Sequence, residues 1–377
     1  MQICICRVRV EYVKLEEICT IVSGGTPSRS KPNYWNNGNI PWIKIKDMKS
    51  KYIDSAEEFI TEEGLNNSST KMLKRNTILY SIFATLGEVG ILKIDACTNQ
   101  AIAGLSLKED SNILKEYLYY YLKSKKKDVN NLGRGVAQNN INLSLLRKFK
   151  IPVIPLRQQK KIIEVLDNVS STINNYEREL ALLDELVKAR FVEMFGDPVS
   201  NSKDLPVQKM NNVAPICQYD GSFEESVWLL NLDMVESQTG RIINYNIVSK
   251  DEIGGSVCTF DENNVLYSKL RPYLNKVVIP DGKGYATSEL VPLRPDPKII
   301  NRIYLAYLLR SNEFVEMIKE KVAGAKMPRV SMSDFREFNV PVPLLELQNQ
   351  FASFVQEIDK SRLLSNHSLL LLKSITF

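Results

Sequence analysis

The 377-residue sequence contains a single histidine, His367. Histidine is the usual general base and the commonest metal ligand, so a Ser-His or Cys-His nucleophile system would have to be built around this one residue. His367 lies in a leucine-rich tail with the pattern of a solvated helix face. The sequence also lacks a P-loop, a GxGxxG motif after a strand and the Asn/Asp-Pro-Pro-aromatic motif of amino-methyltransferases. These absences predict that the chain is not an enzyme by itself.

Other missing features limit where the chain works. Its six cysteines include no CxxC pair, which favours reduced thiols in a cytoplasm. No stretch approaches the roughly 18 apolar residues of a membrane span. The apolar start ends at Arg7 and Arg9, which argues against a secretory signal. With 44% hydrophobic and 25% charged residues, the composition predicts a cytoplasmic globular protein of two or three domains, without a membrane partner.

The second half of the chain repeats the first at an offset of 189 residues, since segment 135–153 aligns without a gap with segment 324–342. The two copies share these residues: Ser144 and Ser333, Arg147 and Arg336, Phe149 and Phe338, Pro152 and Pro341, and Gln159 and Gln348. Solenoid repeats are about 20–50 residues long, so each copy is instead a domain followed by a helix. Two similar surfaces suit a target that also has two parts.

Each copy combines strand-like and helix-like patterns. Short β-branched or aromatic runs bounded by turn residues predict strands at 40–45, 77–82 and 89–94. The predicted helix 117–124 returns as 304–311, and the run 78–81 returns as 265–268. We therefore predict two mixed α/β domains, residues 14–150 and residues 207–339.

The two predicted domains differ in charge. Residues 14–150 hold 21 Lys and Arg against 14 Asp and Glu, whereas residues 207–339 hold 16 against 17. A basic first domain is compatible with a polyanionic partner. The second domain shows that charge alone does not identify that partner.

A heptad pattern lies between the domains and predicts one long helix within residues 151–196. Its seam consists of Ile162, Leu166, Val169, Ile173, Tyr176, Leu180, Leu183 and Val187. Pro155 suits the first turn, and Gly196 supplies the stop. After a linker at 197–206 and the second domain, residues 340–377 predict a shorter C-terminal helix. We expect the two helices to pair antiparallel as a coiled coil; a hairpin inside one compact domain is the alternative.

Several segments, taken in order, resemble the specificity subunits (HsdS) of type I restriction-modification systems. Residues 23–48, which open with Ser-Gly-Gly-Thr-Pro, look like the start of a target recognition domain from that family. The family resemblance continues in Thr-Asn-Gln-Ala at 98–101, in 151–159 and in 191–198, while 264–277 is similar to another recognition-domain subtype. The resemblance covers about residues 13–377, and residues 1–12 match no part of the family; we take residues 1–13 as an N-terminal extension.

The second domain departs from the first in ways that affect its target. It lacks the Gly-Gly-Thr-Pro opening and has Thr-Ser-Glu-Leu at 287–290 where the first domain has Thr-Asn-Gln-Ala. We therefore expect the two domains to read different DNA sequences.

The resemblance implies an α+β fold, with two mixed α/β target recognition domains separated by two long antiparallel coiled-coil helices in a pseudo-two-fold repeat. It also implies a non-catalytic subunit that binds a bipartite, asymmetric site on double-stranded DNA. The helices would set the spacing of the two half-sites and dock two modification subunits, and restriction subunits would join them. No cofactor is expected in this chain, because S-adenosylmethionine would bind to the modification subunits.

In the first domain, the expected DNA-binding residues are polar side chains in loops and at strand ends, which suit base edges and phosphates. They are Thr26, Ser28, Arg29, Lys31, Tyr34, Lys44, Lys46, Thr98, Asn99, Gln100, Arg134, Gln138, Asn139 and Asn140. Lys44 and Lys46 are placed on one outward face of a strand. Three alternatives remain open: the Gly-Gly-Thr-Pro loop as a structural turn, each lysine as a solvated charge, and Asn139 and Asn140 as caps of the next helix.

In the second domain, the expected DNA-binding residues are Tyr219, Ser268, Lys269, Arg271, Tyr273, Lys276, Lys326 and Arg329. Lys269 and Arg271 are predicted to share one face of a strand end. Arg271 is the preferred base reader, with a salt bridge to a neighbouring acid as its alternative. The three tryptophans are expected to be core or loop anchors rather than stacking platforms.

The modification subunits are expected to bind exposed flanks of the long helices, represented by Tyr176, Leu180, Leu183 and Phe191. Pairing between the two helices is the alternative role of these residues. Three other functions compete with DNA specificity: a coiled-coil scaffold without DNA readout, a methyltransferase-specificity fusion, and a silent or defective specificity allele.

Overall fold

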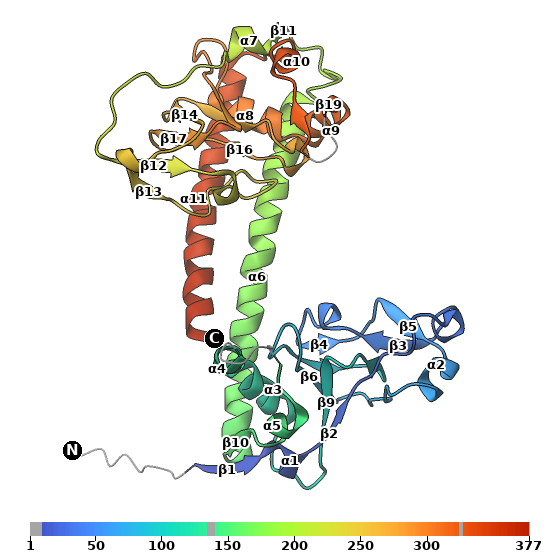
Figure 1. Ribbon diagram of the computed structural model, residues 1–377. Coiled ribbons are helices and arrows are strands. Elements are labelled where there is room, and N and C mark those ends of the chain that lie inside the picture. The colour runs from blue at the N-terminus through green and yellow to red at the C-terminus, as the bar shows by residue number, and fades with distance from the viewer. Residues whose placement is uncertain (1–9, 134–139, 324–326, 377) are drawn as a thin grey trace, which may run out of the picture. The chain divides into compact units, whose positions relative to one another are not determined.

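The computed structural model describes residues 10–133, 140–323 and 327–376. The chain divides into two compact units, unit 1 of residues 1–175 with 369–377 and unit 2 of residues 176–368. The 40-residue helix α6 (Leu156–Phe195) is unbroken and contributes to both units (Figure 1). The 32-residue helix α11 (Leu345–Thr376) lies mostly in unit 2.

Unit 1 is built on two sheets. A five-stranded sheet has the order β2-β9-β6-β7-β4, and a three-stranded sheet has the order β5-β3-β8. Their strands are β2 (Cys19–Ser23), β3 (Ile40–Ile43), β4 (Tyr52–Ile53), β5 (Glu58–Ile60), β6 (Ile78–Ser81), β7 (Val89–Leu92), β8 (Cys97–Thr98) and β9 (Ile102–Leu107). The helices are α1 (Leu15–Ile18), α2 (Glu62–Asn66), α3 (Lys115–Ser124), α4 (Lys126–Gly133) and α5 (Leu143–Arg147). A separate antiparallel pair joins β1 (Glu11–Lys14) to β10 (Lys150–Val153).

Unit 2 is also built on two sheets, but they have four and three strands instead of five and three. Its sheets have the orders β13-β12-β17-β14 and β16-β15-β18, with two further pairs, β11-β21 and β19-β20. The strands are β11 (Val207–Lys209), β12 (Ser226–Leu230), β13 (Ile247–Ser249), β14 (Val257–Phe260), β15 (Val265–Ser268), β16 (Val277–Val278), β17 (Gly284–Thr287), β18 (Leu290–Leu293), β19 (Val322–Ala323), β20 (Arg329–Val330) and β21 (Asn339–Pro341). The helices are α7 (Met210–Val213), α8 (Arg302–Arg310), α9 (Asn312–Glu320) and α10 (Met332–Arg336).

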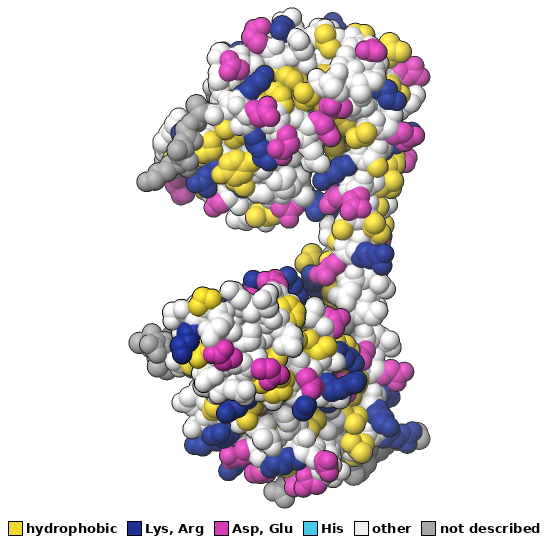
Figure 2. Space-filling view, turned by 90° about the vertical axis from the view of Figure 1, so that its right-hand side faces the viewer, with side chains coloured by type: hydrophobic (Ala, Val, Ile, Leu, Met, Phe, Trp, Pro, Cys, Tyr) yellow, Lys and Arg dark blue, Asp and Glu magenta, His cyan; other side chains and the backbone are white. Residues whose placement is uncertain are grey.

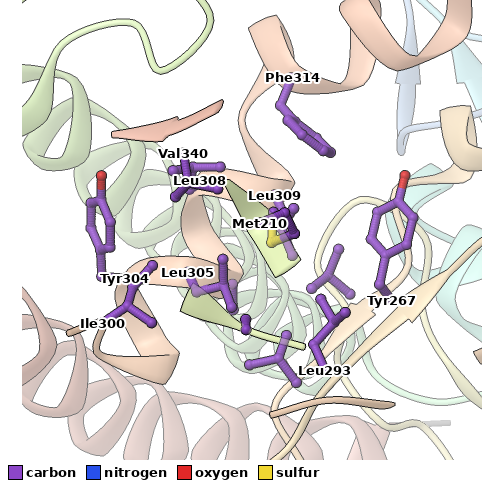
Figure 3. Packing of buried hydrophobic residues seen from close by; sticks show 14 of the residues in the cluster. Met210, Tyr267, Leu293, Ile300, Tyr304, Leu305, Leu308, Leu309, Phe314 and Val340 are labelled. Atoms are coloured by element: carbon purple, nitrogen blue, oxygen red, sulfur yellow. The ribbon is translucent and has the colours of Figure 1, made fainter. Parts of the chain in front are cut away.

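A buried apolar cluster holds α8 against the sheet of β15 in unit 2. Figure 3 shows Leu305, Leu308 and Leu309 of α8 lying between Tyr304 on one side and Tyr267 and Leu293 on the other (Figure 3). Each of these three leucines is fully buried, and burying one such side chain stabilises the fold by about 1.5–3 kcal/mol. The predicted helix at 304–311 is therefore confirmed, with its apolar face in the core.

One pair of shared residues makes the repeat visible at the level of single hydrogen bonds. Gln159 is fully buried; it accepts from the N–H of Leu114 (2.7 Å) and donates to the carbonyls of Asn112 and Ile154. Gln348 is also fully buried and accepts from the N–H of Asn301 (2.8 Å) while donating to two carbonyls. Each glutamine thereby ties the start of a long helix to the loop before α3 or α8.

Within unit 2, α11 runs antiparallel to the second half of α6. Phe191 packs against Phe351, with ring centroids 5.4 Å apart. Further along, Asp184 binds Arg362 at 2.5 Å and Glu179 accepts a hydrogen bond from Ser365. Because the residue numbers rise on α6 as they fall on α11, the predicted antiparallel pairing is confirmed, together with the α+β class.

Candidate nucleic-acid interface

Two of the predicted loops in unit 1 lie side by side. The N–H of Gly25 donates to the carbonyl of Thr98 (2.9 Å), and the Thr26 hydroxyl donates to the Gln100 side chain. A Cβ atom on Gly24 would lie 2.2 Å from the carbonyl oxygen of Asn99, so this approach requires glycine. The Gly-Gly-Thr-Pro loop is therefore a packing turn, and it leaves Thr26 and Gln100 exposed together on the surface.

The cations of this region are paired with acids. Arg29 stacks 3.6 Å above the Trp35 ring and binds Glu58, which also binds Lys44. Burial alone would raise the pKa of Glu58, but the hydrogen bonds from Lys44 and Arg29 hold it below its ordinary value. Lys46 pairs with Glu57. The surface is therefore polar and nearly neutral rather than a bare cationic patch.

The predicted strand placement of two lysines is wrong. Strand β3 ends at Ile43, and Lys44 precedes the short 3₁₀ helix Ile45–Asp47. The N–H of Lys44 donates to the Asp47 carboxylate at 2.7 Å, which fixes this turn. Lys44 and Lys46 thus do not share a strand face.

Other predicted contacts are turned inward. Tyr34, Thr98 and Ser268 are 4%, 0% and 3% exposed, so their side chains do not reach the surface as predicted. Lys31 is exposed but donates to the Tyr34 hydroxyl at 3.0 Å. Lys276 donates to the carbonyl of Leu232 at 2.6 Å, and burial lowers its pKa. Trp42 and Trp228 are buried, in agreement with their expected role as anchors.

In both units, the most consistent candidate for DNA contact is the loop that follows a buried central strand. After β6, Ile82 donates to the carbonyl of Ala101 (2.8 Å) and accepts from the N–H of Ile141 (3.0 Å). After β15, Lys269 donates to the carbonyl of Glu289 (3.0 Å) and accepts from the N–H of Val330 (2.9 Å). The two loops, 82–86 and 269–274, are therefore held in the same way.

The third residue after each strand has a left-handed backbone. Ala84 has φ 61° and Arg271 has φ 49°, a conformation that costs a non-glycine residue roughly 1–2 kcal/mol. Such strain persists only where the surroundings impose it and is concentrated at functional sites. The N–H of Arg271 donates to the carbonyl of Pro328 at 2.8 Å, so the position is fixed by the fold.

Arg271 is exposed, and within the described part of the chain its side chain has no hydrogen-bond or ion-pair partner. The predicted strand face shared with Lys269 is wrong, because β15 ends at Ser268 and the chain turns before Arg271. Arg329 behaves differently: its guanidinium holds Glu289 with an Nη2–Oε1 distance of 2.8 Å. Tyr273, next to this turn, is also exposed.

The strand registers shift the sequence alignment of segment 98–101 with segment 287–290 by one residue. Ile43 pairs with Thr98 in unit 1, and Leu230, at the matching strand end, pairs with Ala286 in unit 2. Ala101 therefore corresponds to Glu289, and Gln100 corresponds to Ser288. The acid that holds Arg329 has no counterpart in the first domain.

Sequence reasoning missed one exposed aromatic residue in the first loop and two half-buried ones in unit 2. Phe83 is 39% exposed and bridges to Asn140, and its signal is its place two residues after the repeated strand. In unit 2, Tyr219 packs against Phe223, which in turn packs against Tyr285 at 4.5 Å. Tyr219 was predicted, whereas Phe223 and Tyr285 have no distinctive local pattern.

The structure describes only some of the remaining predicted polar residues. Asn99 is half-buried and accepts from the N–H of Ala101, and Ser28 is exposed beside Ser30. Asn140 is exposed, and the cap of the following helix is Asn142 rather than Asn140. Four predicted residues lie outside the described residues: Arg134, Gln138, Asn139 and Lys326.

The predicted partner surface needs one correction. Tyr176, Leu180 and Leu183 are half-buried, but Phe191 is 3% exposed and packs in the core against Tyr304 and Phe351. The large apolar side chains that do face solvent on these helices in unit 2 are Leu182, Leu186, Val192, Leu363 and Leu364.

On the face drawn in Figure 2, basic and acidic side chains are interspersed over each unit.

Among the described residues, no cluster of His, Cys, Asp and Glu could hold a metal ion. No helix in the part of the chain that the structure describes is long and apolar enough to cross a membrane.

Comparison with solved structures identifies the fold. The chain superposes on a chain from a study of complex assembly and conformational transition of the type I R-M system, with a TM-score of 0.59, 16% identity and coverage of 97% and 95% of the two chains. It also superposes on the type I restriction-modification S subunit from M. genitalium, with a TM-score of 0.53, 16% identity and coverage of 98% and 95%. At these identities the likeness shows the fold alone.

Sequence comparison identifies the family. The MjaIX specificity subunit of Methanocaldococcus jannaschii is 23% identical over 392 residues, 96% of this chain and 89% of that protein. The EcoR124I/EcoR124II specificity subunit of Escherichia coli is 36% identical over 172 residues, which span 44% of this chain and only 42% of that protein. The model of the type I restriction modification DNA specificity domain matches residues 7–184 and 233–373. This chain belongs to that family.

Proposed function

We propose that the chain is the non-catalytic DNA-specificity subunit of a type I restriction-modification complex, and that each unit reads one half of a bipartite site. Family membership supports the class of function. The observation that carries the division into two readers is the repeated loop, 82–86 in unit 1 and 269–274 in unit 2. Both loops are held by the same backbone bonds and have a left-handed third residue.

The loops differ in what they present, which supports different half-sites. Unit 1 offers Phe83 and Ala84, with Thr26 and Gln100 nearby as amide and hydroxyl groups that suit adenine. Unit 2 offers the exposed guanidinium of Arg271, whose fork suits the O6 and N7 of guanine. We infer that unit 1 reads its half-site mainly through DNA shape, contacts with methyl groups and amide hydrogen bonds. Unit 2 reads its half-site through the guanidinium of Arg271.

The partners proposed for this subunit are double-stranded DNA, two modification subunits and restriction subunits. Exposed leucines on the long helices, Leu182 and Leu186 on α6 and Leu363 and Leu364 on α11, are the proposed docking surface for the modification subunits. Leu363 and Leu364 are 70% and 73% exposed, and uncovered apolar patches of this kind mark protein contacts. S-adenosylmethionine is expected to bind to those partners and not to this chain.

Duplex binding by the assembled complex tests the proposal. The chain is co-purified with its modification subunit and titrated against a pool of random-sequence duplexes at several salt concentrations. We expect an affinity that falls steeply with salt, because phosphate contacts release counterions. A scaffold without DNA readout predicts no salt-dependent binding by the same intact complex, and that result would refute the proposed function.

A further inference from the structure

A cavity of about 640 Å³ lies within unit 2 and has no role in the proposed DNA readout. It is bounded by α6, α8, α11 and the loop 238–242. Its volume falls in the range of about 300–1,000 Å³ typical of small-molecule sites. Apolar side chains line much of it: Val187, Val192, Ile242, Ile279, Ile303 and Val355.

Four arginines also line this cavity: Arg241, Arg302, Arg310 and Arg362. Two of them converge on one acid: Arg241 reaches both oxygens of Asp184 at 2.6 Å, and Arg362 reaches one of them at 2.5 Å. Arg362 also pairs with Asp359. These two arginines therefore have acidic partners.

Arg302 and Arg310 form no ion pair among the described residues, and Arg302 donates instead to the carbonyls of Glu262 and Pro280. The Nε and Nη2 of Arg310 donate to the carbonyl of Val277, at 3.0 and 2.5 Å, and its guanidinium lies 5.3 Å from the Tyr307 ring centroid. Burial lowers the pKa of Arg310, because the charged form loses hydration. A cation removed from water is costly unless an anion accompanies it.

Arg362 offers no open donor to the cavity. Its Nη atoms bind Asp359 and Asp184, and its Nε, which has no hydrogen-bond partner, is buried away from solvent. The cavity thus combines arginines without an acidic partner with apolar walls.

We propose that this cavity binds a small organic oxyanion, with a phosphate, sulfonate or carboxylate head against Arg310. The apolar or aromatic body of the ligand would lie along Val187, Ile303 and Val355. Guanidinium forks suit such heads because they donate two parallel hydrogen bonds. This site is independent of the proposed DNA specificity.

The ligand would contact the loop 238–242 and both long helices at once. Binding to the folded state alone stabilises a protein by mass action. A saturating oxyanion should therefore raise the Tm of the chain, and a neutral molecule of the same shape should raise it less.

The test uses two fluorescent probes on the full chain, the anion 8-anilinonaphthalene-1-sulfonate and its uncharged analogue N-phenyl-1-naphthylamine. The anionic probe should bind more tightly than the neutral one and be displaced by inorganic phosphate. Arg310→Gln should weaken the anionic probe about tenfold, since the substitution removes a charge-assisted hydrogen bond to the head group. It should leave the neutral probe nearly unchanged. Arg336→Gln, at an exposed position outside the cavity, is the matched control.

A second variant keeps the test decisive if Arg310→Gln does not fold. Val192, at the cavity rim, is 51% exposed, so Val192→Trp should fill space without removing a charge or a core side chain. We expect it to abolish binding of both probes with an unchanged circular dichroism spectrum. Equal affinity for the two probes, or anionic binding that survives in both variants, would overturn the proposal.

Discussion

Arg271 shows how one residue is prepared for recognition. Its backbone is fixed in a left-handed turn by the carbonyl of Pro328, and its side chain is exposed without a partner in the described part of the chain. By contrast, Arg329 is held by Glu289 and Arg29 by Glu58. An arginine without an internal acid can bind a base without first breaking a salt bridge.

Replacing Arg271 should therefore relax specificity at a single base pair. Arg271→Ala is expected to reduce discrimination there by about 1–3 kcal/mol, the contribution of a bidentate base contact. The readout is the methylation frequency at each position of the target in cells that carry the whole complex. Arg271→Gly separates side-chain loss from backbone strain, because glycine adopts this conformation freely. A uniform loss at all positions would instead mark Arg271 as a phosphate contact.

Asp261 makes unit 2 sensitive to acid. Burial alone would raise the pKa of Asp261, but the Asn263 N–H and the Arg294 guanidinium, 2.6 Å away, lower it overall. Since the folded-state pKa lies below the unfolded value, the stabilisation is present near neutrality and is lost as pH falls through the folded pKa. Asp261→Asn should lower Tm at pH 7 and flatten its fall below about pH 4. Asp251→Asn, at an exposed position, is the control. If Tm of Asp261→Asn fell with pH in the same way as that of the wild type, this assignment would be contradicted.

Residue exposure was the least predictable property of the candidate site. Thr98 was expected in a surface loop with Asn99 and Gln100, yet it is the last residue of β8 and is buried beneath a loop that begins at Gly24. Tyr34 packs against Gly64, and Ser268 pairs with Leu290 of the neighbouring strand. Contacts between residues far apart in the sequence decide burial here, and no local pattern encodes them.

At the scale of elements, Asp184 on α6 joins three segments of unit 2. It binds Arg362 of α11 and Arg241 of the loop before Ile242. Arg362 is nearly buried and Asp184 is one-third exposed on its side chain. The acid therefore fixes the angle between the helices and that loop.

Asp184→Asn should destabilise the chain by about 1–3 kcal/mol, because two guanidinium groups lose their charged acceptor while solvent screens part of the loss. Urea unfolding measures the effect. Glu185→Gln, exposed on the same helix, should change the unfolding free energy by less than about 0.5 kcal/mol. Equal changes in the unfolding free energy for the two variants would show that Asp184 does not hold these segments together.

The helices were predictable because their signal is local and periodic. The heptad pattern within 151–196 is one helix, Leu156–Phe195, and Phe351 and Val355 occupy the core as its partner in unit 2. The readout loops were less predictable, since β6 ends one residue before the predicted strand 77–82 does, and β15 ends at Ser268 although its strand was expected to reach Arg271. A strand end depends on where its neighbour stops pairing, and that information lies elsewhere in the chain.

At the scale of the whole molecule, the chain keeps one framework twice and varies what it presents. Gln159 and Gln348 make matching buried hydrogen bonds, whereas the loop positions differ, with Ala84 in one unit and Arg271 in the other. Identical scaffolding with different loops is what two unlike half-sites require. The repeat was evident in the sequence because its scaffold residues recur at a fixed offset.

Adenine methylation across a host genome, mapped after co-expression of this chain with its modification subunit, tests the central claim most directly. We predict one new bipartite motif, with two short specified parts around a gap of fixed length. Exchanging residues 269–276 should alter the second part alone. An assembled, soluble complex that leaves no new methylated motif, or a motif in which that exchange changes both parts, would contradict two independent readers on one chain.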